Sequence, residues 1–192
     1  MAPSFKVVIH VASYGAFRIG ELFALRLDDV DWLRGTIRVD ENLTDVNGHL
    51  EFGHPKTERA FRTVPMAEPV MGMLRHHVET ASLQAPQDLL FRGRDGGILR
   101  PNGWRGRQFD SAVRQAGLAP LTPHDLRHTA ASFFIAEGAN QWMLAEILGH
   151  RDTRMIDRVY GHLFEKDRQA LRDRMSQRAT QAALDNVIQL SR

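Results

Sequence analysis

The sequence contains no cysteine, and this absence excludes disulfide bonds and cysteine-based metal sites. It leaves the redox compartment open, so we take the cytoplasm as the expected location. No apolar run approaches the roughly 20 residues that a membrane-spanning helix requires, and no membrane partner is expected. A single Lys6 precedes a short apolar stretch without a small-residue cleavage site, which argues against a signal peptide.

Lysine and tyrosine are also scarce. Lysine occurs only at Lys6, Lys56 and Lys166, and tyrosine occurs only at Tyr14 and Tyr160. The formal net charge of +2 does not by itself predict a nucleic-acid partner, because that signal depends on clustered charge. Hydrophobic residues at 43% and charged residues at 25% are typical of a globular chain with its own core.

One helix in the second half of the chain has clear start and stop signals. Thr122 is a good N-cap residue, Pro123 suits the first helical position, and Asp125 completes a shortened capping box. Apolar residues then recur at helical spacing until Gly138, which is a typical C-terminal stop. The pattern predicts a helix that begins after Thr122 and ends at Gly138.

Basic residues gather at the start of this helix. His124 and Arg127 lie near its first turn, where unpaired amides and the positive end of the helix dipole favour an anion. Two basic side chains there indicate a phosphate site. A second short helix is predicted over 141–148; it delivers His150, and Tyr160 follows ten residues later.

The first part of the chain predicts two helices, over 4–14 and 18–25. Arg18 lies at the start of the second helix, so it offers a cation to an anion. Glu21 follows three residues later and is expected to hold Arg18 in place. Taken alone, the pair is more simply interpreted as a weak surface ion pair. Tyr14 lies in the apolar first helix and is expected to be a core residue.

Three segments alternate apolar and polar residues and predict a small antiparallel sheet: 35–40, 49–52 and 60–66. Asn47-Gly48 before the second segment is a strong hairpin-turn signal. Lys56 lies in the polar turn between the last two strands, where a mobile arm can bring it to a ligand. The alternative is an ordinary solvated turn lysine.

Four more segments predict helices, over 68–81, 102–116, 163–178 and 182–190. The 102–116 helix has a basic face, which is either solvated or follows a phosphate backbone. The predicted fold class is therefore mainly α with a small antiparallel three-stranded β-sheet, an α+β arrangement.

Four separated motifs together resemble the catalytic domain of the tyrosine recombinase (phage integrase) family. Any one of them alone is weak, but all occur in the order that the family has, with a tyrosine after the last. They are YGAFRIGELFALRLDDVD at 14–31, PKTERAFRTVPM at 55–66, HDLRH at 124–128 and LGH at 148–150.

The resemblance implies the roles of the candidate residues. Arg18 and Arg127 would clamp the oxygens of a DNA phosphate, and His150 would donate a further hydrogen bond to it. Tyr160 would be the nucleophile that forms a 3′-phosphotyrosine. By the same resemblance, His124 would accept the proton of the tyrosine and Lys56 would be the general acid. Glu21 and His128 would be supporting residues.

The resemblance also implies partners and a domain division. The expected partners are double-stranded DNA and further protomers, in a tetramer on DNA; neither a cofactor nor a metal is expected. Residues 1–180 would form the catalytic domain and residues 181–192 an interaction tail. Family members carry a helical DNA-binding domain before this one, so the sequence is expected to be a truncated or minimal form with weakened DNA binding.

Three alternatives stay open from the sequence. His124 and His128 have the i, i+4 spacing of a metal-ligand pair, although no acidic third ligand is evident. A type IB topoisomerase uses a similar set of residues, but those enzymes generally have lysine where His124 stands. An inactive DNA-binding remnant of an integrase is the third alternative, against which the complete residue set argues.

Overall fold

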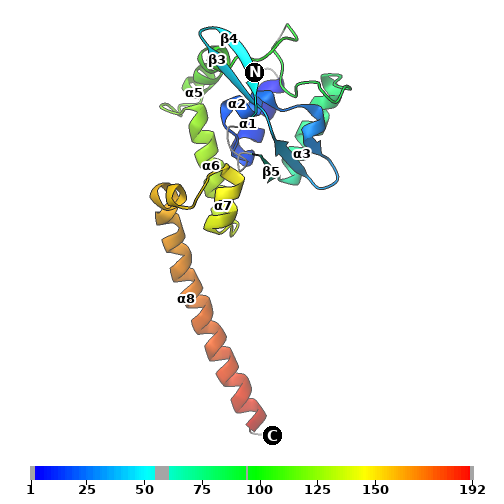
Figure 1. The fold of residues 1–192 in the computed structure, drawn as a ribbon. Coiled ribbons are helices and arrows are strands. Elements are labelled where there is room, and N and C mark those ends of the chain that lie inside the picture. The colour runs from blue at the N-terminus through cyan, green and yellow to red at the C-terminus, as the bar shows by residue number, and fades with distance from the viewer. Residues whose placement is uncertain (1–2, 55–60, 94, 191–192) are drawn as a thin grey trace. The chain divides into compact units, whose positions relative to one another are not determined.

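The computed structural model describes residues 3–54, 61–93 and 95–190. The chain divides into two compact units, residues 1–152 and residues 153–192. The first unit contains the described strands and helices α1 to α7, and the second contains helix α8 (Figure 1). No helix within the described ranges is long and apolar enough to cross a membrane.

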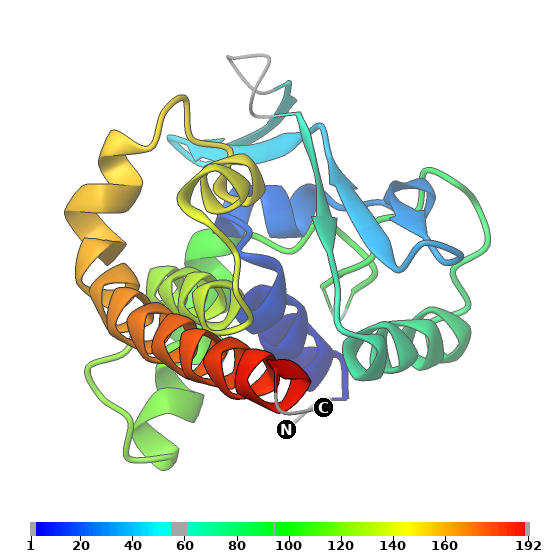
Figure 2. The ribbon, with the colours of Figure 1, turned by 90° about the horizontal axis from the view of Figure 1, so that it is seen from below.

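Helix α1, Pro3–Gly15, lies at the centre of the first unit. It packs against α6, Pro123–Ala136, and against α3, Glu68–Thr80, as the view from below shows (Figure 2). Val11 and Ala130 are fully buried on α1 and α6. The spacing of apolar residues therefore predicted these three helices correctly.

A second part of the core is aromatic. The Trp104 ring lies 5.3 Å from the Phe23 ring, edge to face, and 5.2 Å from the Phe109 ring. These contacts join α2 to the segment predicted as one helix over 102–116, which contains a π-helical turn. The elements involved are α2 (Ile19–Ala24), α4 (Pro101–Trp104), η3 (Arg105–Phe109) and α5 (Asp110–Gln115).

The predicted strands form, but they do not share one sheet. The three-stranded antiparallel sheet has the order β1 (Val30–Asp31), β2 (Thr36–Val39) and β5 (Arg62–Pro65). Strand β1 lies before the first segment that the sequence predicted as a strand. The segment expected between β2 and β5, which is β4 at His49–Gly53, instead pairs with β3 at Asn42–Val46. A tight hairpin turn pairs a strand with its immediate neighbour in sequence, so Asn47-Gly48 directs β4 to β3.

Short elements complete the first unit. A 3₁₀ turn, η1, spans Leu27–Asp29 and leads from α2 into β1. Helix α7, Gln141–Leu148, has the predicted bounds. Its Asn140 side chain caps the helix by accepting from the Trp142 and Met143 amides at 3.0 and 2.9 Å.

Two local predictions are wrong. Helix α8 is continuous over Arg154–Leu190, whereas the sequence predicted separate helices over 163–178 and 182–190 with Tyr160 before them. The sequence of α8 is mostly polar, so it lacks the apolar spacing from which a single continuous helix could be predicted. Tyr14 is not a core residue: it is 38% exposed and lies against Phe133, with ring centroids 5.2 Å apart.

Candidate functional site

Arg18 lies immediately before α2, where Glu21 holds it as expected. The Arg18 backbone N–H donates to Glu21 Oε2 at 2.8 Å, and Arg18 Nη1 donates to Oε1 at 2.7 Å. The Arg18 side chain is 44% exposed, whereas that of Glu21 is 4% exposed. A buried carboxylate thus holds Arg18 at its backbone N–H and at one guanidinium nitrogen, while the side chain stays partly exposed.

Gly20 explains how closely α2 packs against the β3–β4 ribbon. A Cβ atom at this position would lie 2.4 Å from the Leu43 carbonyl oxygen and 2.5 Å from Asn42 Oδ1. Because both distances are shorter than van der Waals contact, α2 can approach β3 this closely only with glycine here. The tight packing fixes the start of α2, and with it Arg18.

Arg127 is buried, with 4% of its surface exposed. Its Nη1 donates to the Ala16 carbonyl and its Nη2 donates to the Leu148 carbonyl at 2.6 Å. Ala16 lies two residues before Arg18, and Leu148 lies two residues before His150. Arg127 therefore joins the two segments that carry the other candidate residues.

His150 follows the end of α7 through Gly149, whose φ of 64° is the left-handed conformation of a helix C-cap. Its Nε2 lies 3.4 Å from Arg127 Nη2. Burial, followed by the positive charges of Arg127, Arg18 and Arg62, lowers the pKa of His150 to about 4. The imidazole is consequently neutral at pH 7 and has one N–H to donate.

The other ring nitrogen of His150 is unusual. His150 Nδ1 is buried and accepts or donates no hydrogen bond within the described part of the chain. An unsatisfied buried polar group costs about 1–3 kcal/mol, so such groups are uncommon in folded proteins.

His124 and His128 lie next to each other on α6. Their rings meet edge to face with centroids 4.7 Å apart. Partial desolvation, then the charges of His128, Arg127 and Arg18, lower the pKa of His124. His124 is therefore close enough to both arginines to experience their charge, and its neutral form can accept a proton at pH 7.

The predicted capping box at the start of α6 is present. The Thr122 backbone N–H and hydroxyl both donate to Asp125 Oδ2 at 2.7 Å. These bonds lower the pKa of the Asp125 carboxyl. The capping box sets where α6 begins, and so sets the positions of His124 and Arg127.

Sequence reasoning missed Arg62 on β5. Its side chain is 1% exposed and forms an ion pair with Glu21 at 2.7 Å. A signal was present, because strand alternation places Arg62 on the same face as the fully buried Val64. An arginine at an inward strand position requires a buried partner.

Two candidates remain, Lys56 and Tyr160. Lys56 falls outside the described residues. Tyr160 belongs to the second unit, on α8, where its side chain is 6% exposed. Among the described residues, no group of three or more His, Cys, Asp or Glu side chains could hold a metal ion.

Comparison with known proteins shows which family the chain belongs to. The model of the phage integrase family matches residues 4–167. The chain belongs to the phage integrase family. This confirms the resemblance seen in the four sequence motifs.

Curated members of the phage integrase family are similar at low identity. Prophage integrase IntR of Escherichia coli strain K12 is 29% identical over 171 residues, covering 78% of this chain and 41% of IntR. The ICEBs1 integrase of Bacillus subtilis strain 168 is 25% identical over 177 residues, covering 89% of this chain and 48% of that integrase. The chain spans less than half the length of these two relatives.

The fold is also that of a solved integrase structure. A structure of the Tn1549 transposon integrase in complex with circular intermediate DNA has a TM-score of 0.75 to this chain. It is 24% identical, and the match covers 88% of this chain and 59% of that integrase. The predicted fold class, mainly helical with a small antiparallel sheet, is confirmed.

Proposed function

We propose that this chain is the catalytic part of a site-specific recombinase that cleaves and rejoins DNA strands. The observation that carries the proposal is the meeting of Arg18, Arg127 and His150 in one place within the family's fold. These residues come from three separated segments, and Arg127 joins the other two segments through backbone carbonyls.

The cluster is suited to a DNA phosphate. Partly exposed Arg18 offers planar, charge-assisted hydrogen bonds to the non-bridging oxygens, largely buried Arg127 adds positive charge, and His150 offers a neutral N–H. Cationic groups held in place before reaction stabilise the charge that develops on phosphorus oxygens in the transition state. Partly exposed Arg18 provides the access that buried Arg127 does not.

Tyr160 is the proposed nucleophile. Its phenol oxygen would attack phosphorus, forming a 3′-phosphotyrosine bond while the bond from phosphorus to the 5′-oxygen breaks. His124 would take the tyrosine proton, which its lowered pKa permits at neutral pH. Lys56 would give a proton to the leaving 5′-oxygen.

The reverse reaction would rejoin the strands. A free 5′-hydroxyl attacks the phosphotyrosine, releasing Tyr160 and restoring the phosphodiester. The covalent bond conserves the energy of the broken one, so the chemistry needs no ATP, metal or other cofactor. Exchange between two duplexes would use double-stranded DNA and four protomers, one for each strand that is cut.

The test is covalent trapping on a pool of nicked duplexes with randomised sequence. A pool is needed because residues that contact a phosphate do not specify the DNA sequence of the target site. Cleavage beside the nick releases a short fragment, which leaves protein attached to DNA under denaturing conditions. We expect an adduct that maps to Tyr160, forms equally with EDTA, and disappears in Tyr160→Phe while DNA binding is retained.

Other outcomes select the alternatives. An adduct that persists in Tyr160→Phe contradicts the assignment of the nucleophile. Relaxation of supercoiled plasmid by a single protomer, without strand exchange, would indicate a topoisomerase-like activity. DNA binding with no adduct at any protein concentration, also after fusion to a helical DNA-binding domain from a relative, would indicate an inactive remnant.

A further inference from the structure

Arg62 makes contacts that link the two halves of the proposed phosphate site. Its Nη2 and Nη1 donate to Glu21 Oε2 and Oε1 at 2.7 and 3.1 Å. Its Nε donates to the Ile147 carbonyl at 2.6 Å. One guanidinium thus holds a carboxylate of α2 and the last turn of α7 at the same time.

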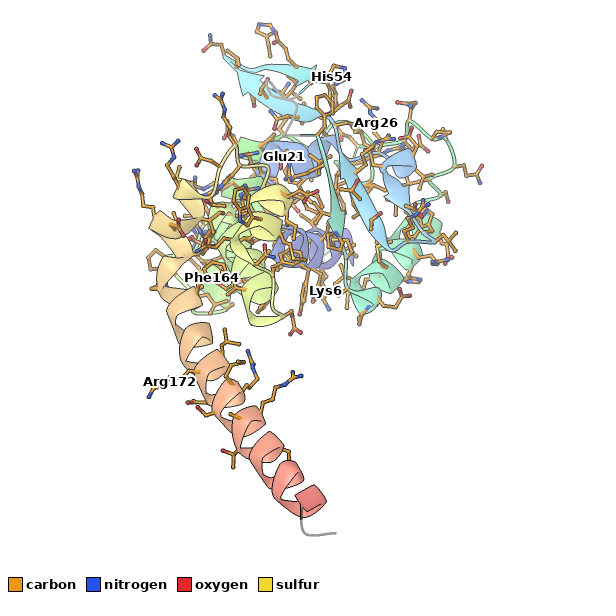
Figure 3. All side chains as sticks on the ribbon, turned by 60° about the horizontal axis from the view of Figure 1, so that its bottom comes forward. Lys6, Glu21, Arg26, His54, Phe164 and Arg172 are labelled. Atoms are coloured by element: carbon orange, nitrogen blue, oxygen red, sulfur yellow. The ribbon has the colours of Figure 1, made fainter. Side chains whose placement is uncertain are left out.

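Each partner of Arg62 lies beside a residue that would contact the phosphate. Glu21 also accepts the backbone and side-chain hydrogen bonds of Arg18. Figure 3 labels Glu21 on α2, inside the first unit. Ile147 precedes His150 by three residues, and a Cβ atom on the intervening Gly149 would lie 3.2 Å from Arg62 Nη1.

Arg62 itself cannot contact DNA, because its side chain is 1% exposed. Any effect on the reaction must pass through the residues that it holds. Two such routes exist: the geometry of Arg18 through Glu21, and the position of His150 through the end of α7. The positive charge of Arg62 also reaches His150, since it is one of the causes that lower the pKa of that histidine.

We propose that Arg62 is a positioning residue, which fixes Arg18 and His150 relative to each other through Glu21 and the Ile147 carbonyl. The proposal rests on the proposed function, in which Arg18 and His150 bind the scissile phosphate. A planar fork is needed for this task, because lysine has one charged nitrogen and cannot bridge the carboxylate and the carbonyl with the same geometry.

A matched control lies on the neighbouring strand. Arg38 of β2 pairs with Thr63 in the sheet register, directly beside the pair formed by Val39 and Arg62. Arg38 also forms ion pairs, with Asp29 at 2.9 Å and Asp40 at 2.8 Å, but its side chain is 51% exposed. Replacing either arginine by lysine changes the same chemical group in the same sheet.

The experiment compares Arg62→Lys with Arg38→Lys in the full chain. DNA affinity and the single-turnover rate of adduct formation are measured on the nicked pool recovered with the unmodified protein. Displacements of about 1 Å far from the chemistry can slow a reaction about 100-fold. We expect Arg62→Lys to slow adduct formation by about 10- to 100-fold with DNA affinity changed less than about 2-fold, and Arg38→Lys to change neither.

A second variant covers the case in which a lone substitution prevents folding. Glu21→Gln combined with Arg62→Gln removes both buried charges, so neither is left without a partner. We expect this double variant to fold, to bind DNA, and to form adduct about 100-fold more slowly. A rate equal to that of the unmodified protein in either folded variant would overturn the proposal. So would a parallel loss of binding and rate, which indicates a general structural role.

An independent reading comes from NMR titration of His150, with its signal assigned by His150→Asn. We expect its pKa to rise above about 4 in the double variant, yet to stay below 6.5 because burial, Arg127 and Arg18 still lower it, and to remain low in Arg62→Lys and Arg38→Lys. If the unmodified protein forms no adduct, the proposed function fails, and this titration alone decides whether Arg62 acts on His150. An unchanged pKa in the double variant would then refute the inference.

Discussion

Two carboxylate–arginine clusters lie close together in the first unit, yet the pKa of the central carboxyl group is lowered in one and raised in the other. The inner cluster is Glu21 with Arg62 and Arg18, and the outer cluster is Asp29 with Arg38 and Asp40. Both Glu21 and Asp29 are buried, with 3% and 6% of their surfaces exposed. Burial by itself therefore does not distinguish them.

The difference lies in what surrounds each carboxylate. Burial works to raise the pKa of Glu21, but the hydrogen bonds and charges of Arg62 and Arg18 outweigh it and leave this pKa below 4.5. For Asp29, burial and the nearby charge of Asp40 outweigh the Arg26 amide and Arg38, so its pKa lies above 3.8. A buried carboxylate is stabilised only where its hydrogen bonds exceed its desolvation cost.

The largest difference is expected from removing the two arginines. Arg62→Met leaves Glu21 buried without its main partner, which should cost about 3–5 kcal/mol in the free energy of unfolding. Arg38→Met removes a half-exposed arginine and leaves Asp29 its hydrogen bond from the Arg26 amide, so it should cost about 1 kcal/mol or less. Urea unfolding of both variants at pH 7 measures the difference, and equal losses would contradict the distinction between the clusters.

Removing the carboxylates should give a smaller effect of the same kind. Glu21→Gln keeps an oxygen that can accept from Arg62 but leaves the buried Arg62 charge without its carboxylate, and it should cost about 3 kcal/mol at pH 7. Asp29→Asn should cost less than about 1 kcal/mol, because the raised pKa of Asp29 shows that its charged form is disfavoured in the folded state. A larger loss for Asp29→Asn, measured in the same unfolding experiment, would reverse this ranking.

The pH dependence has a definite sign. The folded pKa of Glu21 is below 4.5, so its stabilisation is present above that pH and is lost as the pH falls further. The folded pKa of His150 is about 4 against an ordinary 6.5, so its neutral form supports folding above pH 6.5, and this support is lost as the pH falls through about 4.

Thermal unfolding between pH 7 and pH 4 tests this prediction. The melting temperature should fall with pH, and His150→Asn should reduce the fall between pH 6.5 and 4, because asparagine does not titrate. A raised pKa of Asp29 acts in the opposite direction, since its protonation relieves an unfavourable buried charge. The Asp29→Asn variant should therefore lose stability with acid more steeply than the unmodified protein.

Local signals in the sequence predicted much of the first unit. Apolar spacing predicted α1, α3 and α6, and cap residues predicted where α6 and α7 end. The pairing of Arg18 with Glu21 was also predicted, because both residues lie within one turn. Such features depend on neighbours a few residues apart, and therefore on information that a short stretch of sequence contains.

Other features could not be predicted in this way. The long polar helix α8 gave no periodic start signal at Arg154, and β4 joined the ribbon with β3 instead of the three-stranded sheet. The roles proposed for Lys56, His124 and Tyr160 came from the family resemblance and remain predictions. Lys56 lies outside the described residues.

The sequence alone thus determined the family, the helical framework and the identities of the candidate phosphate-binding residues. Only the tertiary structure decided that Arg62, 41 positions from Glu21 and 85 from Ile147, holds both. The physical reason is that a buried charge must find its partners wherever the fold brings them, and sequence distance does not limit that choice.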